Sequence, residues 1–125
     1  MYELGTVRHF EAAHRLVGDF GPATRMHGHT YRLEVTLRGE RLDQSGALMD
    51  VGRLAPILDA LVARLHMRDL SEVPELSNLN TTAETVARFC WDVLAPDLHA
   101  QGFSSMAVRL WESPNIFAGY EAPLS

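Results

Sequence analysis

The sequence has very little cysteine, and this limits the cross-links and metal sites that it can build. Cys90 is the single cysteine in 125 residues, so an intrachain disulfide is excluded. A metal site would therefore use His and carboxylate ligands rather than thiolates. Cys90 falls at helical spacing among apolar residues, which favours a buried structural thiol over a nucleophile.

Lysine is absent, and so are long apolar runs. The 11 basic residues are all Arg, and 16 acidic residues outweigh them to give a formal net charge of −5. A nucleic-acid-binding surface is normally basic, so we expect no nucleic-acid partner. No segment approaches the ~20 apolar residues of a membrane helix, and the first residues lack the features of a secretory signal. We therefore expect a cytoplasmic protein with no membrane partner.

The hydrophobic pattern predicts an α+β fold in one domain, residues 1–125. The expected order is strand, strand, helix, helix, strand, strand. The first strand is predicted over residues 2–14, and the last two over 105–112 and 117–121. The second strand shows strict alternation, which is typical of an antiparallel strand with one face buried. Its apolar positions are Tyr31, Leu33, Val35 and Leu37.

Two helices are predicted between the strand pairs. Asp50 opens the first, and the segment from Thr81 to Glu84, which has the spacing of a capping box, opens the second. Pro96 is expected to end the second helix. The buried stripe of the first helix is Leu54, Leu58, Leu61 and Leu65. The apolar face of the second is Val86, Phe89, Cys90, Val93 and Leu94.

Three histidines are candidates for a metal site. His27 and His29 flank one glycine in extended chain, so both rings lie on the same side, about 6–7 Å apart at the backbone. His14 ends the buried face of the first strand, and the three rings converge if the two strands pair as a hairpin. Three neutral imidazoles with an open fourth position form the catalytic type of zinc site. The alternative is an ordinary pair of core or surface histidines.

Glu112 is an unusual residue for its place in the pattern. It continues a strand face whose other members are the apolar Met106, Val108 and Leu110. A carboxylate there must be paired or bonded to a ligand. Two parallel N–H donors on a flat heterocycle, such as a 2-amino-4-oxo pyrimidine edge, would suit it. The alternative is a strand-end Glu that turns to solvent.

These segments together resemble the 6-pyruvoyl-tetrahydropterin synthase and 6-carboxytetrahydropterin synthase family over nearly the whole chain. The segments that carry the resemblance are Phe10–His14, His27–Tyr31, Gly46–Val51, Thr81–Glu84 and Trp111–Ser113. The resemblance implies the tunnelling fold, or T-fold, in which two helices cover one side of antiparallel strand pairs. It also implies a homo-oligomer, a trimer or hexamer, in which subunits join into barrels.

The same resemblance implies a ligand set. Zinc would be held by His14, His27 and His29, and the pterin ring would be anchored by Glu112 with help from the segment around Thr82. The usual substrate of the family is 7,8-dihydroneopterin triphosphate. Zinc would polarise the hydroxyl and carbonyl oxygens of its side chain, which favours proton removal and then elimination or cleavage.

The sequence departs from the family at its acid–base groups. The family's catalytic cysteine lies four residues before the His-Gly-His motif, and Ala23 stands there. In an ungapped alignment, the family's Asp-His pair after the first helix falls on His66 and Met67, whereas a one-residue shift would place His66 at the position of the family's His. The candidates that remain for proton transfer are His66, Asp69 and Glu112.

Three functions are therefore compatible with the sequence. The first is a zinc-dependent lyase that acts on a dihydropterin with altered acid–base groups. The second is an enzyme of the same fold with a different pterin or a purine-like substrate. The third is a zinc- and pterin-binding homologue without turnover. Retention of the metal ligands and the ring anchor favours the first two.

Overall fold

Two long strands form the centre of the molecule. A computed structural model describes residues 1–124 and, at position 100, the backbone alone. Strand β1 (Tyr2–His14) pairs antiparallel with β2 (His27–Gly39), in a register that runs from Tyr2 opposite Gly39 to His14 opposite His27. The strict alternation of the second strand explains this register, because a slip of one residue would turn every apolar side chain of β2 to the other face.

The sheet has the order β3-β1-β2-β4-β5. Strand β4 (Ser105–Ser113) pairs antiparallel with β2, and β5 (Ile116–Pro123) pairs antiparallel with β4. The short β3 (Arg68–Asp69) runs parallel to β1. The sequence did not predict β3, because two residues are too few to show any periodicity. The four long strands are confirmed, with β4 and β5 slightly longer than expected.

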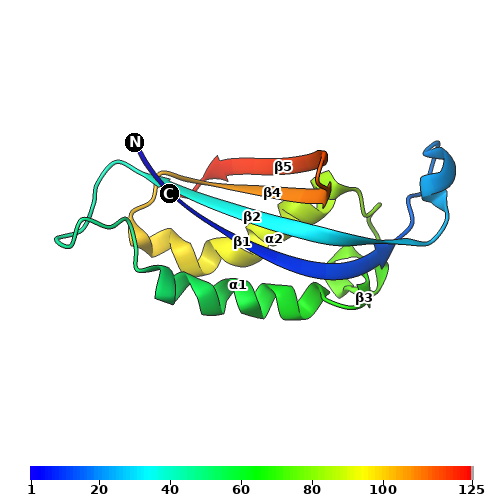
Figure 1. Cartoon of the computed structure of the whole chain (residues 1–125), viewed down its shortest axis with the longest axis horizontal. Helices are drawn as coiled ribbons and strands as arrows, with labels where there is room; N and C mark the ends of the chain where they lie inside the picture. Colours follow the sequence, from blue (N-terminus) through cyan, green and yellow to red (C-terminus); the bar gives the residue numbers. More distant parts are fainter. Residues whose placement is uncertain (125) are drawn as a thin grey trace.

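Both helices lie on one side of the sheet, as Figure 1 shows. Helix α1 (Val51–Leu65) packs beside β1, and α2 (Ala83–Leu98) packs on β4 and β5. We call the side under the helices the covered face and the other side the open face. The predicted stripe of α1 is buried, and so is the covered face of β2: Leu54, Leu58, Leu61, Leu65, Tyr31, Leu33, Val35 and Leu37.

The two helix starts are capped by side chains. Asp50 accepts a hydrogen bond from the backbone of Gly52, as expected for the start of α1. The start of α2 lies one residue later than the capping-box spacing predicted, because Thr82 rather than Thr81 is the N-cap and accepts from the backbone of Thr85.

The prediction that Pro96 ends α2 was wrong. Pro96 lies inside the helix, which continues to Leu98. A proline removes one helical hydrogen bond, but Ala95 and Leu98 on either side of it are buried against the rest of the protein. Their packing holds the last turn in spite of the missing donor.

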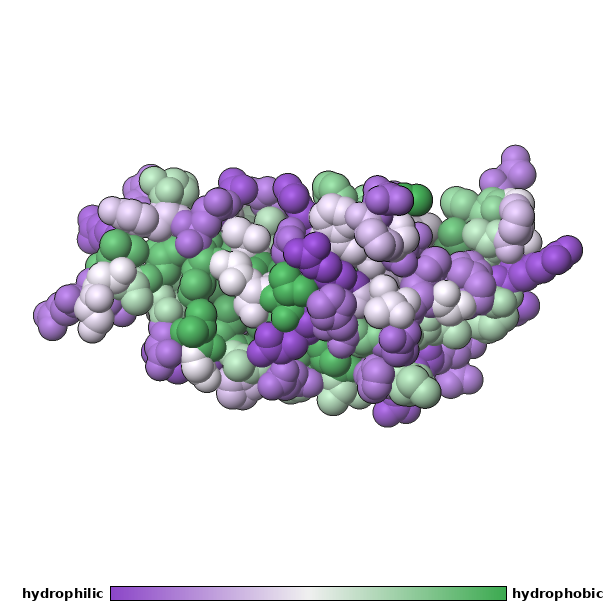
Figure 2. Space-filling model, viewed as in Figure 1, coloured by the Kyte–Doolittle hydropathy of each residue, from purple (hydrophilic) through white to green (hydrophobic). Residues whose placement is uncertain are grey.

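Short 3-10 helices occur in the connections. They are η1 (Gly21–Thr24), η2 (Leu70–Glu72), η3 (Pro74–Leu76) and η4 (His99–Gln101). The segment with η1 projects beyond the end of the sheet in Figure 1, and Figure 2 shows hydrophobic atoms on it. Val17, Phe20 and Met26, in and around this segment, are exposed. None of the helices in residues 1–124 has the length and hydropathy needed to cross a membrane.

Candidate functional site

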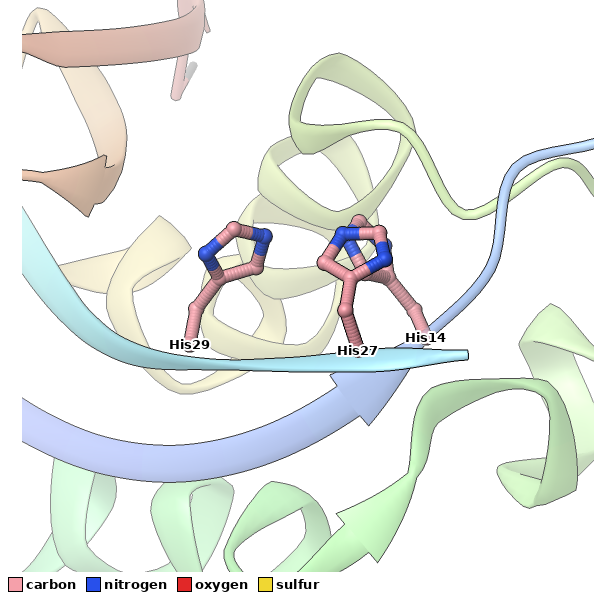
Figure 3. Close-up of side chains that lie close together, drawn as sticks. All are labelled: His14, His27 and His29. Carbon is pink, nitrogen blue, oxygen red and sulfur yellow. The ribbon is translucent and has the colours of Figure 1, made fainter. Parts of the chain in front are cut away.

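The three candidate histidines meet at one end of the covered face. The β1–β2 register sets His14 opposite His27 and places His29 opposite Ala12, so all three rings leave the sheet on the same side. Figure 3 shows the rings turned toward one another beneath the start of α2. The ring centroids are 4.6, 4.8 and 5.1 Å apart. Each ring offers one nitrogen that lies within 4.8 Å of the others.

Backbone carbonyls fix the protonation pattern of two of the rings. His14 Nδ1 donates to the carbonyl of Thr81 at 2.8 Å, and His27 Nδ1 donates to the carbonyl of Arg25 at 2.7 Å. A neutral imidazole carries one proton, so both rings keep an unprotonated Nε2. This is the arrangement that orients metal-ligating histidines in proteins.

Two of the ring nitrogens are buried without a partner. His14 is only 1% exposed, and Nε2 of His14 and of His29 is buried with no hydrogen-bond partner in the described chain. Buried polar atoms are nearly always satisfied. Two such orphans beside a third imidazole fit the demands of a divalent metal, which accepts the lone pairs of neutral rings. The cluster is thus a site that could hold a metal ion.

The surroundings of His29 favour its neutral form. Burial lowers the pKa of His29. The neighbouring His14 and His27 lower this pKa further, whereas the negative charge of Glu112 raises it. A lowered pKa keeps the imidazole uncharged near neutral pH. The ring is therefore in the form that binds metal rather than the form that repels it.

A cavity of about 340 Å³ brings together both residues that were predicted to bind substrate, Glu112 and Thr82. Apolar side chains, among them Phe20 and Phe117, supply much of its wall. The complete lining is Leu16, Phe20, Thr82, Ala83, Glu84, Glu112, Ile116, Phe117 and Ala118. A mainly apolar cavity with a few polar groups is the usual form of a small-molecule site.

A β-bulge directs Glu112 toward this cavity. Trp111 pairs with Phe117 and Ser113 pairs with Ile116, so Glu112 is an extra residue on β4. A bulge bends its strand and re-aims a side chain. The Glu112 side chain is half-buried, and its charge acts on both His29 and Tyr31. The carboxylate, the cavity and the histidine cluster are thus parts of one site.

The similarity of the chain to known proteins is consistent along its length. The sequence profile described as 6-pyruvoyl tetrahydropterin synthase matches residues 3–123. The chain belongs to this family. A 6-pyruvoyl tetrahydrobiopterin synthase of Dictyostelium discoideum is 32% identical, with 89% of each chain covered. A 6-carboxy-5,6,7,8-tetrahydropterin synthase of Haemophilus influenzae is 30% identical, with 97% of this chain and 99% of the relative covered.

The T-fold prediction is confirmed by solved structures of the family. The 6-pyruvoyl tetrahydropterin synthase of Caenorhabditis elegans superposes with a TM-score of 0.83 at 25% identity and covers 97% of this chain and 95% of its own. The Plasmodium falciparum protein of the same name shares the fold at a TM-score of 0.81, although only 17% of residues are identical and 98% of each chain is covered.

The predicted acid–base residues lie outside the histidine cluster. His66 follows the end of α1, and its Nδ1 accepts a hydrogen bond from the backbone of Glu11 at 3.1 Å. Asp69 accepts bonds from the backbone and the hydroxyl of Ser71. Asp69 also lines a second cavity of about 450 Å³ beside β3, and the lining of this cavity includes His29. The catalytic roles of these two residues stay predictions.

The two residues at altered family positions cannot exchange protons. Ala23 lies in η1, and its carbonyl accepts a hydrogen bond from the backbone of Leu16. Met67 is 75% exposed and adopts a left-handed backbone with φ of 60°. A non-glycine residue in this conformation stores about 1–3 kcal/mol of strain. Met67 therefore combines an unusual backbone conformation with a side chain that does not titrate.

The sequence interpretation missed three contributors to the site. Tyr31 was read as an ordinary core residue, although it lies two residues from His29 on the same face. Glu84 was read as a capping residue, but it lines the cavity with Glu112. Phe20 sits in a loop that showed no pattern. The parity of Tyr31 was the one signal that could have indicated its place.

Proposed function

We propose that this chain is a zinc-dependent, lyase-type enzyme that acts on a dihydropterin such as 7,8-dihydroneopterin triphosphate. The observation that carries the proposal is the set of unpaired histidine nitrogens beside a cavity that contains a half-buried carboxylate. The activities named for the relatives, a pyruvoyl- and a carboxy-tetrahydropterin synthase, support the same class of chemistry.

The histidines are suited to hold zinc. Three neutral imidazoles without a thiolate or carboxylate leave one coordination position for substrate. When bound there, zinc supplies Lewis-acid polarisation of a hydroxyl or carbonyl oxygen. The carbonyls of Thr81 and Arg25 hold the rings of His14 and His27 so that Nε2 faces the common centre.

The cavity is suited to bind the ring of the substrate. Glu112 would accept two parallel N–H groups from the pyrimidine edge of a pterin, a geometry that a carboxylate matches with both oxygens. Phe20 and Phe117 offer apolar surface to the ring faces, and Thr82 lies at the start of α2 on the same wall. Ring binding and metal binding would then fix the substrate side chain over the histidine cluster.

Proton transfer must come from groups other than those of the family pattern. Ala23 has no exchangeable proton on its side chain, and Met67 does not titrate. We propose His66 and Asp69 as the replacements, since both lie in the segment that follows α1. Loss of a general base commonly lowers a rate by about 10²–10⁴, so turnover of 7,8-dihydroneopterin triphosphate should be weak.

A second candidate function follows from the same two positions. The changes at Ala23 and Met67 remove the family's proton carriers while the ring anchor and the histidines remain. This combination favours a homologue that acts on a different pterin or a purine-like compound, or one that binds zinc and pterin without turnover. Turnover separates an enzyme that acts on a pterin from a homologue that only binds one, and a homologue with a purine-like substrate would not bind pterin.

The decisive experiment measures binding and turnover with the same zinc-loaded protein. Affinity for 7,8-dihydroneopterin is measured by calorimetry, and consumption of 7,8-dihydroneopterin and of its triphosphate is followed in steady state. We expect binding, together with slow turnover that His66→Ala lowers further. Binding without any turnover would favour the non-catalytic alternative, and absence of binding would refute a pterin function. His9→Ala, which changes an exposed histidine on β1, is the matched control.

A further inference from the structure

Tyr31 carries a hydroxyl group that the fold leaves without a partner. The residue is 1% exposed, and its hydroxyl is buried with no hydrogen-bond partner within residues 1–124. The ring itself is well packed, because it stacks on Phe10 at 5.0 Å and meets the ring of His29 edge-on at 5.2 Å. Phenylalanine would fill the same space without a polar atom to bury, so packing does not account for the hydroxyl.

Glu112 is a carboxylate acceptor on the strand next to Tyr31. The pairing of β2 with β4 sets Leu33 opposite Leu110 and Arg32 opposite Trp111. Tyr31 and Glu112 are the residues that follow this last pair on the two strands, and the negative charge of Glu112 acts on Tyr31. Side chains directly opposite each other on antiparallel strands lie close enough to interact.

The two groups are also chemically complementary. Within the described chain, no hydrogen bond or ion pair holds the Glu112 carboxylate, although the residue is half-buried. A phenol is a donor at neutral pH and a carboxylate accepts at up to about four lone-pair sites. A carboxylate that binds two N–H groups of a ligand with one side therefore keeps lone pairs free for a donor from the protein.

We propose that Tyr31 is a positioning residue for Glu112, whose hydroxyl donates to the carboxylate and fixes its orientation toward the ligand. The inference rests on the proposed pterin function, since it concerns how the ring anchor is held. It also explains why a polar atom is kept in the core beside the histidine cluster. The hydroxyl serves ligand recognition rather than the stability of the ligand-free fold.

A double-mutant cycle tests this role. Dissociation constants for pterin, a fluorescent ring without a side chain, are measured for wild type, Tyr31→Phe, Glu112→Ala and the double variant. Tyr31→Phe should weaken binding about 10-fold, the size expected for a hydrogen bond to a charged group. The same change in the Glu112→Ala background should alter binding less than about 2-fold, because coupled residues are not additive. Tyr2→Phe, an exposed tyrosine at the far end of β1, is the control.

Two further measurements keep the test decisive. The thermal midpoint of ligand-free Tyr31→Phe should not fall below that of the wild type, because the hydroxyl has no partner to lose. A crystal structure of the pterin complex should place the Tyr31 and Glu112 oxygens about 2.5–3.0 Å apart. Equal effects of Tyr31→Phe in both backgrounds, a clear fall in the midpoint, or separated oxygens would each overturn the inference. Failure of the wild type to bind pterin would instead overturn the proposed function, and this inference with it.

Discussion

Removal of a single histidine from the cluster should abolish stoichiometric metal binding. His27→Ala and His29→Ala each take away one of three nitrogens that converge within 4.8 Å. Two remaining imidazoles do not make a catalytic zinc site, which normally has three protein ligands and one exchangeable ligand. We expect one zinc ion per chain in the wild type and in the control His9→Ala, at nitrogen–zinc distances of about 2.0–2.1 Å.

The effect on stability follows from linkage. A metal present at about 100 times its dissociation constant stabilises the native state by about 2.7 kcal/mol. For a chain of this size, that corresponds to a rise of roughly 8–16 °C in the thermal midpoint. Metal binding also satisfies the buried Nε2 atoms of His14 and His29, which have no hydrogen-bond partner among the described residues. The two histidine variants should show almost none of this rise.

The assay combines metal analysis of chelator-treated and reloaded protein with thermal unfolding. Full metal retention in both variants, or equal midpoint shifts in variants and wild type, would refute the assignment of the site. Extended X-ray absorption spectra of the loaded wild type provide a direct check on the nitrogen ligands.

Acid should release the metal and destabilise the metal-free protein. The pKa of folded His29 lies below the ordinary value of 6.5 because of burial, so the unfolded chain binds more protons than the native chain. The contribution of this ring to stability is therefore fully present above pH 6.5 and is lost as the pH falls toward the lowered pKa. Denaturant titrations of chelated protein at several pH values measure this slope, and a stability that rises on acidification would contradict it.

Ligand binding, assembly, catalysis and thiol reactivity offer further tests. Glu112→Gln should weaken pterin binding by about 2–5 kcal/mol if the carboxylate pairs with buried N–H groups, and unchanged affinity in calorimetry would reject that role. The chain should sediment as a trimer or hexamer, because the sheet has open edges that favour pairing with another copy, and a monomer at micromolar concentration would be inconsistent with this. The double change Ala23→Cys with Met67→His should raise turnover of 7,8-dihydroneopterin triphosphate, whereas fast wild-type turnover that His66→Ala leaves intact would show that other groups move the protons. Cys90 should resist iodoacetamide in the native state because burial raises the pKa of its thiol to about 12, and alkylation as fast as in unfolded protein would argue against burial.

The sequence predicted most of the fold because the sheet has one covered and one open face. That asymmetry produces the alternation of β2 and the helical stripe of α1, which are local patterns. The same parity argument brought His14, His27 and His29 to one side, and the register of β1 and β2 confirms their convergence. Features set by two or three residues, such as β3 and the continuation of α2 past Pro96, have no comparable pattern.

The remaining parts of the site depend on contacts between distant segments. The bulge at Glu112 is a property of the β4–β5 pairing, which a single strand sequence does not reveal. The cavity wall combines Phe20, Thr82 and Phe117 from three separate parts of the chain. The sequence indicated that Glu112 is a carboxylate on an otherwise apolar strand face. The cavity that it lines forms only when the distant segments come together in the fold.

The carbonyls that orient His14 and His27 belong to the backbone, and this has a consequence for the evolution of the chain. Substitution of Thr81 or Arg25 changes a side chain but leaves the acceptor of the imidazole proton in place. The orientation of the two rings therefore depends on the path of the main chain and tolerates side-chain substitutions at positions 25 and 81. Side chains around the site can therefore change during evolution while the histidine cluster keeps its geometry.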